Sequence, residues 1–151
     1  MNKPLLVLDT NVVLDLLHFE DVIAQPILEA LQNGRVHCAV TEDILEEFRR
    51  VLNYPEFELA PTKQATLFER YLSLAKTVSA VSLVMELPLC SDPDDQKFLQ
   101  LAASCHAHTL VSKDRALLKL RRRCAPHFQV MTPAEAGRWL QDVNPGSAAE
   151  T

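Results

Sequence analysis

Apolar positions along the chain follow two alternating spacings, one typical of buried strands and the other of helices. Short apolar runs from Leu5 to Leu8 and from Val36 to Val40 predict buried strands. Residues 12–17 and 22–32 are predicted to form helices, and the second is expected to stop at Asn33-Gly34. Strands that alternate with helices favour a parallel sheet, so the pattern predicts an α/β fold.

The middle of the chain predicts two further helices and one ambiguous segment. Thr41 is expected to cap a helix that runs through Leu52, because its hydroxyl can accept from a free amide of the first turn. A longer helix is expected over residues 62–77. The segment from Val78 to Val84 fits neither pattern clearly, and its state stays open.

The last third of the chain resumes the alternation. Asp92-Pro93 predicts a clean helix start, because Asp caps free amides and Pro suits the first helical position. Thr132-Pro133-Ala134-Glu135 combines a capping box with a first-turn proline and predicts a final helix. The expected elements are a helix to about His106, a strand ending near Ser112, a short helix over 115–122, an edge strand over 129–131 and a final helix to about Gln141.

Length and composition fit one ordinary globular domain. With 151 residues, 48% of them hydrophobic and 23% charged, the chain can bury a core without disulfides or metal as support. We expect a single domain over residues 1–142 and a disordered polar tail over 143–151. The net charge of -5 does not exclude nucleic acid, because binding follows local basic patches more than the total.

The cysteines and the apolar runs bear on where the protein is found. Its 4 cysteines form no CxxC pair, which predicts neither a zinc site nor a disulfide framework and favours reduced thiols in the cytoplasm. The apolar run near the start is too short for a signal peptide. No stretch reaches the roughly 20 apolar residues that span a bilayer, so no membrane association is expected.

Two acids follow apolar strands at distant points of the chain. Asp9 ends the run from Leu5 to Leu8, and Asp114 ends the segment 109–113 in the same way. Groups beyond the carboxyl ends of parallel strands converge on one crevice, so these carboxylates can share a site. Each could instead simply cap the helix that follows it. Their repetition after two strands favours a site, because caps need not be acidic.

Neighbouring acids elsewhere can be separated by helix geometry at about 3.6 residues per turn. Glu47 falls on the border of the apolar arc of its helix, whereas Glu46 lies nearly opposite the centre of that arc. Asp95 falls on the apolar stripe of its own helix, whereas Asp94 projects toward solvent. Asp92 is expected to be the cap, with metal binding as its alternative role. First-turn acids are often only structural, because the helix dipole favours them.

Converging carboxylates repel one another, so the predicted site requires a proton or a cation. Two unit charges about 4 Å apart repel by about 4 kcal/mol at an effective dielectric near 20. Ligands that are all oxygen suit Mg²⁺ or Mn²⁺, and Mg²⁺ is usually bound by few carboxylates together with substrate phosphates. The expected chemistry is metal-assisted hydrolysis of phosphodiester bonds.

Four segments together resemble the motifs of PIN domains. They are Leu8-Asp9-Thr10-Asn11-Val12, Leu45-Glu46-Glu47-Phe48, Asp92-Pro93-Asp94-Asp95-Gln96-Lys97-Phe98-Leu99 and Leu110-Val111-Ser112-Lys113-Asp114. The resemblance extends from about Leu5 to Ala136 and looks closest to the branch described as toxin components of bacterial toxin-antitoxin systems. It implies a three-layer α/β/α sandwich around a parallel sheet of about five strands, and an enzyme that cuts RNA with Mg²⁺ or Mn²⁺, often as a homodimer.

The resemblance also implies roles for individual residues. Asn11 matches a polar residue that supports the first aspartate, and Ser112 stands where many members have Thr, which preserves the hydroxyl. The four residues that match the acidic, metal-binding and catalytic quartet are Asp9, Glu47, Asp95 and Asp114.

The densest basic segment, residues 113–123, has two interpretations. Its cations could bind RNA phosphates, or they could form a solvated helix end, where positive charge also suits the helix dipole. The basic residues are Lys113, Arg115, Lys119, Arg121, Arg122 and Arg123.

Three functions compete for this sequence. The leading hypothesis is a metal-dependent endoribonuclease, with RNA, an antitoxin protein and a second copy of the chain as partners. The alternative is an RNA-binding or regulatory module that keeps the fold but turns over slowly or not at all, and the intact acidic quartet weighs against it. A haloacid-type phosphotransferase needs a second acid two residues after the first, and this chain has Asn11 there, so we set that reading aside.

Overall fold

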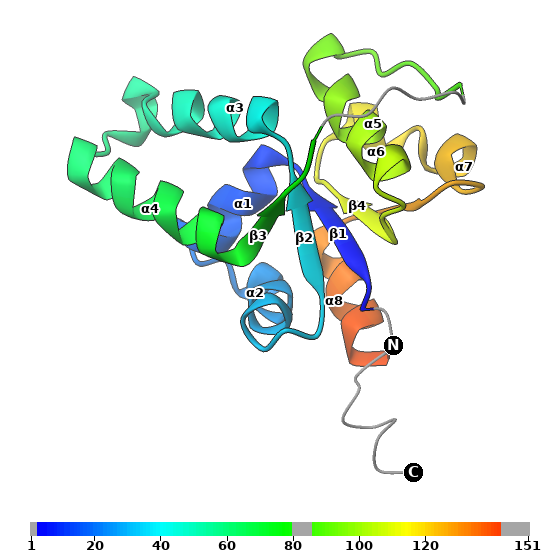
Figure 1. Ribbon diagram of the computed structural model, residues 1–151, viewed down its shortest axis with the longest axis horizontal. Coiled ribbons are helices and arrows are strands. Elements are labelled where there is room, and N and C mark those ends of the chain that lie inside the picture. Colours follow the sequence, from blue (N-terminus) through cyan, green and yellow to red (C-terminus); the bar gives the residue numbers. More distant parts are fainter. Residues whose placement is uncertain (1–2, 80–85, 143–151) are drawn as a thin grey trace.

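The computed structural model describes residues 3–79 and 86–142, and a parallel sheet of five strands lies at its centre. The strand order is β3-β2-β1-β4-β5 (Figure 1). The strands are β1 (Leu5–Leu8), β2 (His37–Val40), β3 (Ala75–Thr77), β4 (Thr109–Val111) and β5 (Gln129–Met131). The predicted α/β fold with about five parallel strands is confirmed. The tail expected over 143–151 lies outside the described residues.

Strand β1 is the point at which the order of the sheet reverses. The chain first adds β2 and β3 on one side of β1, then crosses over to add β4 and β5 on the other. Leu6 pairs with Thr109 and Leu8 with Val111, so the carboxyl ends of β1 and β4 are level with each other. Open α/β sheets bind ligands at such a switch point. The topology therefore directs attention to the residues that follow these two strands.

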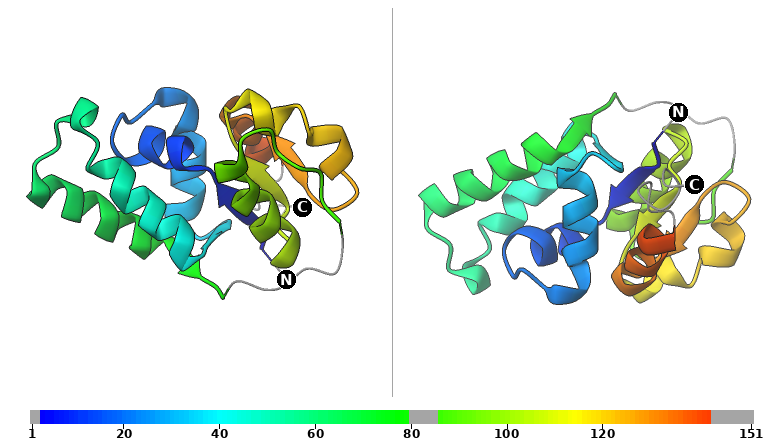
Figure 2. Two further views of the ribbon diagram at one scale, coloured as in Figure 1. Left: turned by 90° about the horizontal axis from the view of Figure 1, so that it is seen from above. Right: turned by 90° about the horizontal axis from the view of Figure 1, so that it is seen from below.

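Helices lie on both faces of the sheet (Figure 2). Helix α5 packs on β1 and β4, whereas α2 and α8 pack against each other. Burial is complete for many side chains between these layers, among them Leu6, Phe98 and Leu110. The helices are α1 (Thr10–Leu17), α2 (Gln25–Gln32), α3 (Glu42–Leu52), α4 (Pro61–Leu74), α5 (Gln96–Ser104), α6 (Arg115–Leu118), α7 (Arg121–Cys124) and α8 (Pro133–Asp142), with 3₁₀ turns η1 (Val22–Ala24), η2 (Pro55–Phe57) and η3 (Pro93–Asp95).

Two of the three helix starts that were predicted from capping chemistry are confirmed. At the third, Asp92 caps the 3₁₀ turn η3, and the helix α5 begins only at Gln96. The Thr41 hydroxyl accepts from the amide of Ile44 at the start of α3. At the start of α8, the amide of Glu135 donates to the Thr132 hydroxyl at 3.1 Å, and the amide of Thr132 donates to the Glu135 carboxylate at 2.9 Å. These reciprocal bonds satisfy free amides that a helix start otherwise leaves unpaired.

The helix predicted over 62–77 is wrong at its end. Helix α4 stops at Leu74, and Ala75–Thr77 forms edge strand β3, which pairs with Cys38 to Val40. The amide of Val78 extends this pairing by donating to Val40 at 2.8 Å. Pairing with the free edge of β2 outweighs the local helical pattern. A sequence window cannot detect this pairing, because the partner strand lies elsewhere in the chain. Most of the ambiguous segment that followed, residues 80–84, lies outside the described residues.

Two other predicted helices are divided. The helix over 22–32 begins as the turn η1 and becomes α-helical at Gln25, because Pro26 fits only the first turn of a helix. The helix over 115–122 separates into α6 and α7 around Leu120, which is itself buried. None of the helices in the described residues is long and apolar enough to cross a membrane.

Candidate metal centre and nucleic-acid cleft

Asp9, the first residue of the site, lies just beyond the carboxyl end of β1. Its Oδ1 accepts from the amides of Asn11 at 2.8 Å and Val12 at 3.4 Å, so it caps helix α1. Its Oδ2 accepts from the Ser112 hydroxyl, and only 5% of the residue is exposed. Burial raises the pKa of Asp9, while the hydrogen bond from Ser112 opposes that rise. The capping role that competed with the site role is therefore confirmed, and Asp9 is also a buried acid at a strand end.

Ser112 connects the ends of the two strands. Besides donating to Asp9, its hydroxyl accepts from the amide of Asp114 at 2.9 Å. Asp114 in turn caps α6 by accepting from the amide of Ala116 at 2.9 Å. The two acids that the sequence placed after separate strands thus lie on either side of one hydroxyl. Asn11 contacts Asp9 through its backbone amide, while its side chain is exposed in the same cleft.

Asp92, Asp95 and Asp114 form a carboxylate cluster. Each offers one oxygen, and these oxygens all lie within 4.8 Å of one another. Burial and the hydrogen bond with Asp114 raise the pKa of Asp95 to about 8. The same hydrogen bond holds the pKa of Asp114 below its usual value. Without a cation, the cluster therefore holds a proton between two of its members at neutral pH.

The cluster fits a hard divalent cation. Asp95 Oδ2 is buried and finds no hydrogen-bond partner among the described residues. A buried carboxylate oxygen without a partner is costly, and a cation would remove that cost together with the repulsion between the acids. The donor set consists of oxygen alone, which suits Mg²⁺ or Mn²⁺ and not a metal that prefers nitrogen or sulfur.

Glu47 reaches the cleft from helix α3. Its Oε2 accepts from the Thr10 hydroxyl at 2.7 Å, and its Oε1 pairs with the ammonium group of Lys97. Glu46 instead lies on the solvent side, where it forms an exposed ion pair with Arg49 at 3.7 Å. The helix phase predicted from the apolar arc thus describes the two side chains correctly.

A single cleft of about 470 Å³ lies above the strand ends, and we call it the strand-end cleft. Its lining comes from α1, α3 and η2 and from η3 and the start of α5. Figure 1 shows α3 and α5 apart from each other above the strand ends. It contains Asp9 and Asn11 after β1, Glu47 on α3, and the whole carboxylate cluster. The acids that were predicted to converge therefore open into one space.

A family model described as the PIN domain matches residues 5–116 of the chain, which is most of its length. The chain belongs to the PIN-domain family. A crystal structure of VapBC2 from Rickettsia felis, bound to a DNA fragment from their promoter, has the same fold, with a TM-score of 0.59 and 14% identity. That alignment covers 85% of this chain and 98% of the other. No curated protein matches the chain significantly.

Sequence reasoning overlooked several cleft residues of this PIN domain. Lys97 and Arg50 bring positive charge into the strand-end cleft, and Tyr54 and Phe57 bring aromatic rings. The helical spacing of the sequence could have indicated two of these residues. Arg50 and Tyr54 follow Glu47 by three and seven positions, which places all three on one side of α3 and its continuation. Lys97 gave no such signal, because its contact with Glu47 joins separate helices.

The basic side chains of the segment over 113–123 lie apart from the cleft lining. Lys113 forms an ion pair with Asp15 at 2.6 Å, and Arg121 pairs with Glu135 at 3.1 Å. Arg115, Arg122 and Arg123 are exposed. None of these five residues lines the strand-end cleft in the part of the chain that the structure describes. A role in RNA binding therefore requires a substrate that extends beyond the cleft.

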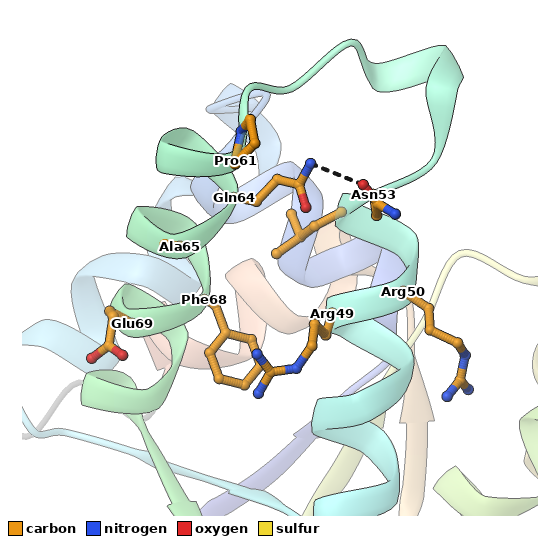
Figure 3. Close-up of a pocket in the computed structure, with 9 residues that line it drawn as sticks. Arg49, Arg50, Asn53, Pro61, Gln64, Ala65, Phe68 and Glu69 are labelled. Atoms are coloured by element: carbon orange, nitrogen blue, oxygen red, sulfur yellow. Dashed lines mark hydrogen bonds between the residues drawn. The ribbon is translucent and has the colours of Figure 1, made fainter.

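A second hollow of about 470 Å³ lies between α3 and α4 (Figure 3). Arg49 lies over the ring of Phe68 at 4.1 Å, and Gln64 bonds to Asn53 at 3.2 Å across its upper end. Arg50 extends from another side of α3, away from Phe68. This hollow contains no cluster of acids, and its contacts hold the two helices together.

Proposed function

We propose that this PIN domain is an endoribonuclease that hydrolyses RNA phosphodiester bonds with Mg²⁺ or Mn²⁺. The observation that carries the proposal is the carboxylate cluster, in which Asp95 keeps a buried oxygen without a partner at the end of the central strands. An arrangement that costs stability in the metal-free protein is expected where a ligand compensates for it. PIN-domain membership independently supports a nuclease.

The acids differ in their proposed tasks. Asp95 and Asp114 would hold the metal, with Asp92 as a further ligand from the same cluster. Asp9 adds negative charge beside them and, through Ser112, fixes the position of Asp114. A bound Mg²⁺ or Mn²⁺ lowers the pKa of a water and stabilises the charge that develops on the phosphate.

Glu47 has a separate proposed task on the facing wall of the cleft. Thr10 and Lys97 each hold one oxygen of its carboxylate, so the group cannot rotate freely. A fixed acceptor can orient the attacking water toward the phosphate. Asn11, whose side chain is exposed in the cleft, is a candidate contact for the RNA itself.

The proposed partners follow from the resemblance to the toxin branch. We propose an antitoxin protein and a second copy of this chain as partners, and the fold shared with VapBC2 supports the former. We further assign RNA binding to Lys113, Arg115, Arg121, Arg122 and Arg123, in a cytoplasmic protein.

The decisive experiment incubates purified protein with single-stranded RNA in Mg²⁺, in Mn²⁺ and in chelator. Cleavage is expected only with metal, and Asp114→Asn purified in parallel controls for contaminating nuclease. Cleavage that survives chelation would overturn the proposal. RNA binding without cleavage under every metal condition would favour the alternative, a PIN-fold RNA-binding or regulatory module.

A further inference from the structure

Aromatic rings form one wall of the strand-end cleft and continue beyond it. We propose that this wall binds unpaired bases of the RNA substrate by stacking. The inference rests on the proposed function, because it describes how the substrate of that same cleft is held. We call the rings of Tyr54, Phe57, Phe19 and His18 the aromatic row.

The rings of the row contact one another in sequence. Tyr54 and Phe57 both line the cleft, and their rings are nearly parallel, with centroids 6.5 Å apart and planes inclined by 7°. Phe57 lies 6.1 Å from Phe19 and 6.4 Å from His18. The row therefore begins in the cleft that also contains the carboxylate cluster, and it continues through Phe57 of η2 to the end of α1.

The exposure of these rings is not explained by the core. Phe57 is partly buried and packs against the core, so it anchors the row. Tyr54 remains 46% exposed and Phe19 55% exposed, so much of each ring faces water. Large apolar groups that stay exposed together near a polar cleft are typical of binding surfaces. Bases of a single strand stack on such rings, whereas bases inside a duplex are covered by their neighbours.

Arg50 provides the charge that a base-binding wall needs. It lines the same cleft, is exposed, and forms no ion pair with any residue that the structure describes. Its neighbour Arg49 is engaged by Glu46 and Phe68. In Figure 3 the two guanidinium groups leave α3 in different directions. Arg50 can therefore contact a phosphate of the RNA in the cleft, whereas the other cation there, Lys97, is already paired with Glu47.

The test measures binding separately from cleavage. Affinities are determined by fluorescence anisotropy in Ca²⁺, which replaces the catalytic ion, for a ten-nucleotide single strand, its duplex, and a single strand whose central residues lack bases. We expect Tyr54→Ala and Phe19→Ala each to weaken binding of the normal strand by about tenfold, the usual effect of removing one stacking ring. The strand without bases should bind both variants and the wild type equally. Tyr54→Phe should retain wild-type affinity, because it keeps the ring.

Two further variants distinguish base binding from other effects. Arg50→Ala should weaken both single strands by the same factor, because it contacts phosphate. Leu89→Ala removes a side chain that is 80% exposed but outside the row, and it should bind like the wild type. Circular dichroism establishes that each variant is folded before its affinity is compared.

Three outcomes would overturn the inference. The first is an equal decrease in affinity for strands with and without bases, and the second is duplex binding as tight as that of the single strand. The third is a change in oligomeric state of the ring variants with unchanged RNA affinity, which would assign the row to a protein contact. If the wild type cleaves RNA and the ring variants bind normally, only this inference fails. If no RNA is bound or cleaved at all, the proposed function fails with it.

Discussion

The carboxylate cluster and the basic segment over 113–123 both concentrate charge, but the spacing and pairing of their charges differ in the folded protein. In the cluster, three acids approach one another, two of them partly buried, and the pKa of Asp95 rises to about 8. In the basic segment, the cations spread over α6 and α7, and Lys113 and Arg121 each meet an acid of the protein itself. Only the cluster places like charges close together, and their repulsion lowers the stability of the folded protein.

This contrast indicates which charged groups deserve a functional assignment. Like charges that are held together cost free energy in the folded protein, so they persist where a ligand relieves them. Charges that are spread over a surface and paired with opposite charges cost little and contribute little. We therefore expect large effects from changes in the cluster and small ones from changes in the basic segment.

The largest expected effect is on cleavage. Asp95→Asn and Asp114→Asn should each lower the single-turnover rate in Mg²⁺ or Mn²⁺ by at least about tenfold, because each removes a proposed metal ligand. Asp43→Asn is the matched control, since Asp43 is exposed and does not line the strand-end cleft. Gel-based cleavage assays at saturating RNA provide the rates. An equal decrease in all three variants would mean that the cluster has no special role.

A smaller but directional effect is expected from the neighbouring glutamates of α3. Glu47→Gln should lower the cleavage rate several-fold more than Glu46→Gln, because only Glu47 faces the cleft and holds Thr10 and Lys97. The same single-turnover assay compares them. The opposite ranking would place the functional side of α3 on its solvent face.

Metal binding should also be visible without RNA. A ligand at about 100 times its dissociation constant stabilises the folded state by about 2.7 kcal/mol, which raises the Tm of a domain of this size by about 5 to 10 °C. Asp95→Asn should shrink the shift produced by Mn²⁺ while the basic triple variant Arg121, Arg122 and Arg123 to Ala keeps it. Thermal melts followed by circular dichroism make the comparison. Equal shifts in Asp95→Asn and the wild type would remove the metal site from this cluster.

The metal-free protein should lose stability as pH rises. The folded state retains the Asp95 proton up to about pH 8, whereas the unfolded chain releases it near pH 4, so the folded state binds more protons across that window. The free energy of unfolding therefore falls from about pH 4 to 8. Asp114 has a lowered pKa, so its contribution is present above about pH 4 and disappears only in more acidic solution.

Asp95→Asn should flatten this decline, because an amide cannot ionise. Urea unfolding in chelator at pH 5, 6, 7 and 8 measures it for both proteins. Parallel profiles for the wild type and the variant would show that another group is responsible.

The smallest effect is expected from the basic segment. Changing Arg121, Arg122 and Arg123 together to Ala should weaken RNA binding and reduce its log-log salt slope by somewhat less than one unit for each phosphate that the variant no longer binds. The cleavage rate at saturating RNA should stay nearly intact. Binding isotherms across a salt series provide both numbers. Unchanged affinity and slope would identify the segment as a solvated surface.

The parts of the site that were predictable depend on local geometry. Asp9 and Asp114 could be located because parallel strands end at one edge of the sheet, and Glu47 because helix phase follows from its apolar neighbours. Lys97 could not, because its contact with Glu47 depends on how two distant helices pack. Edge strand β3 was missed for the same reason, since the free edge of β2 decides its conformation.

Ser112 has a consequence for the synthesis of this protein. Its hydroxyl joins residues separated by 103 positions, and strand β1 acquires its β4 neighbour only after Val111 has been made. Chains emerge from the ribosome from the amino end onward, so β1, β2 and most helices are present before the last acid of the cluster, Asp114. A nascent chain therefore cannot assemble the carboxylate cluster until Asp114 has been made. If the proposed function holds, the enzyme would be synthesised on an RNA template with its site still incomplete until that point.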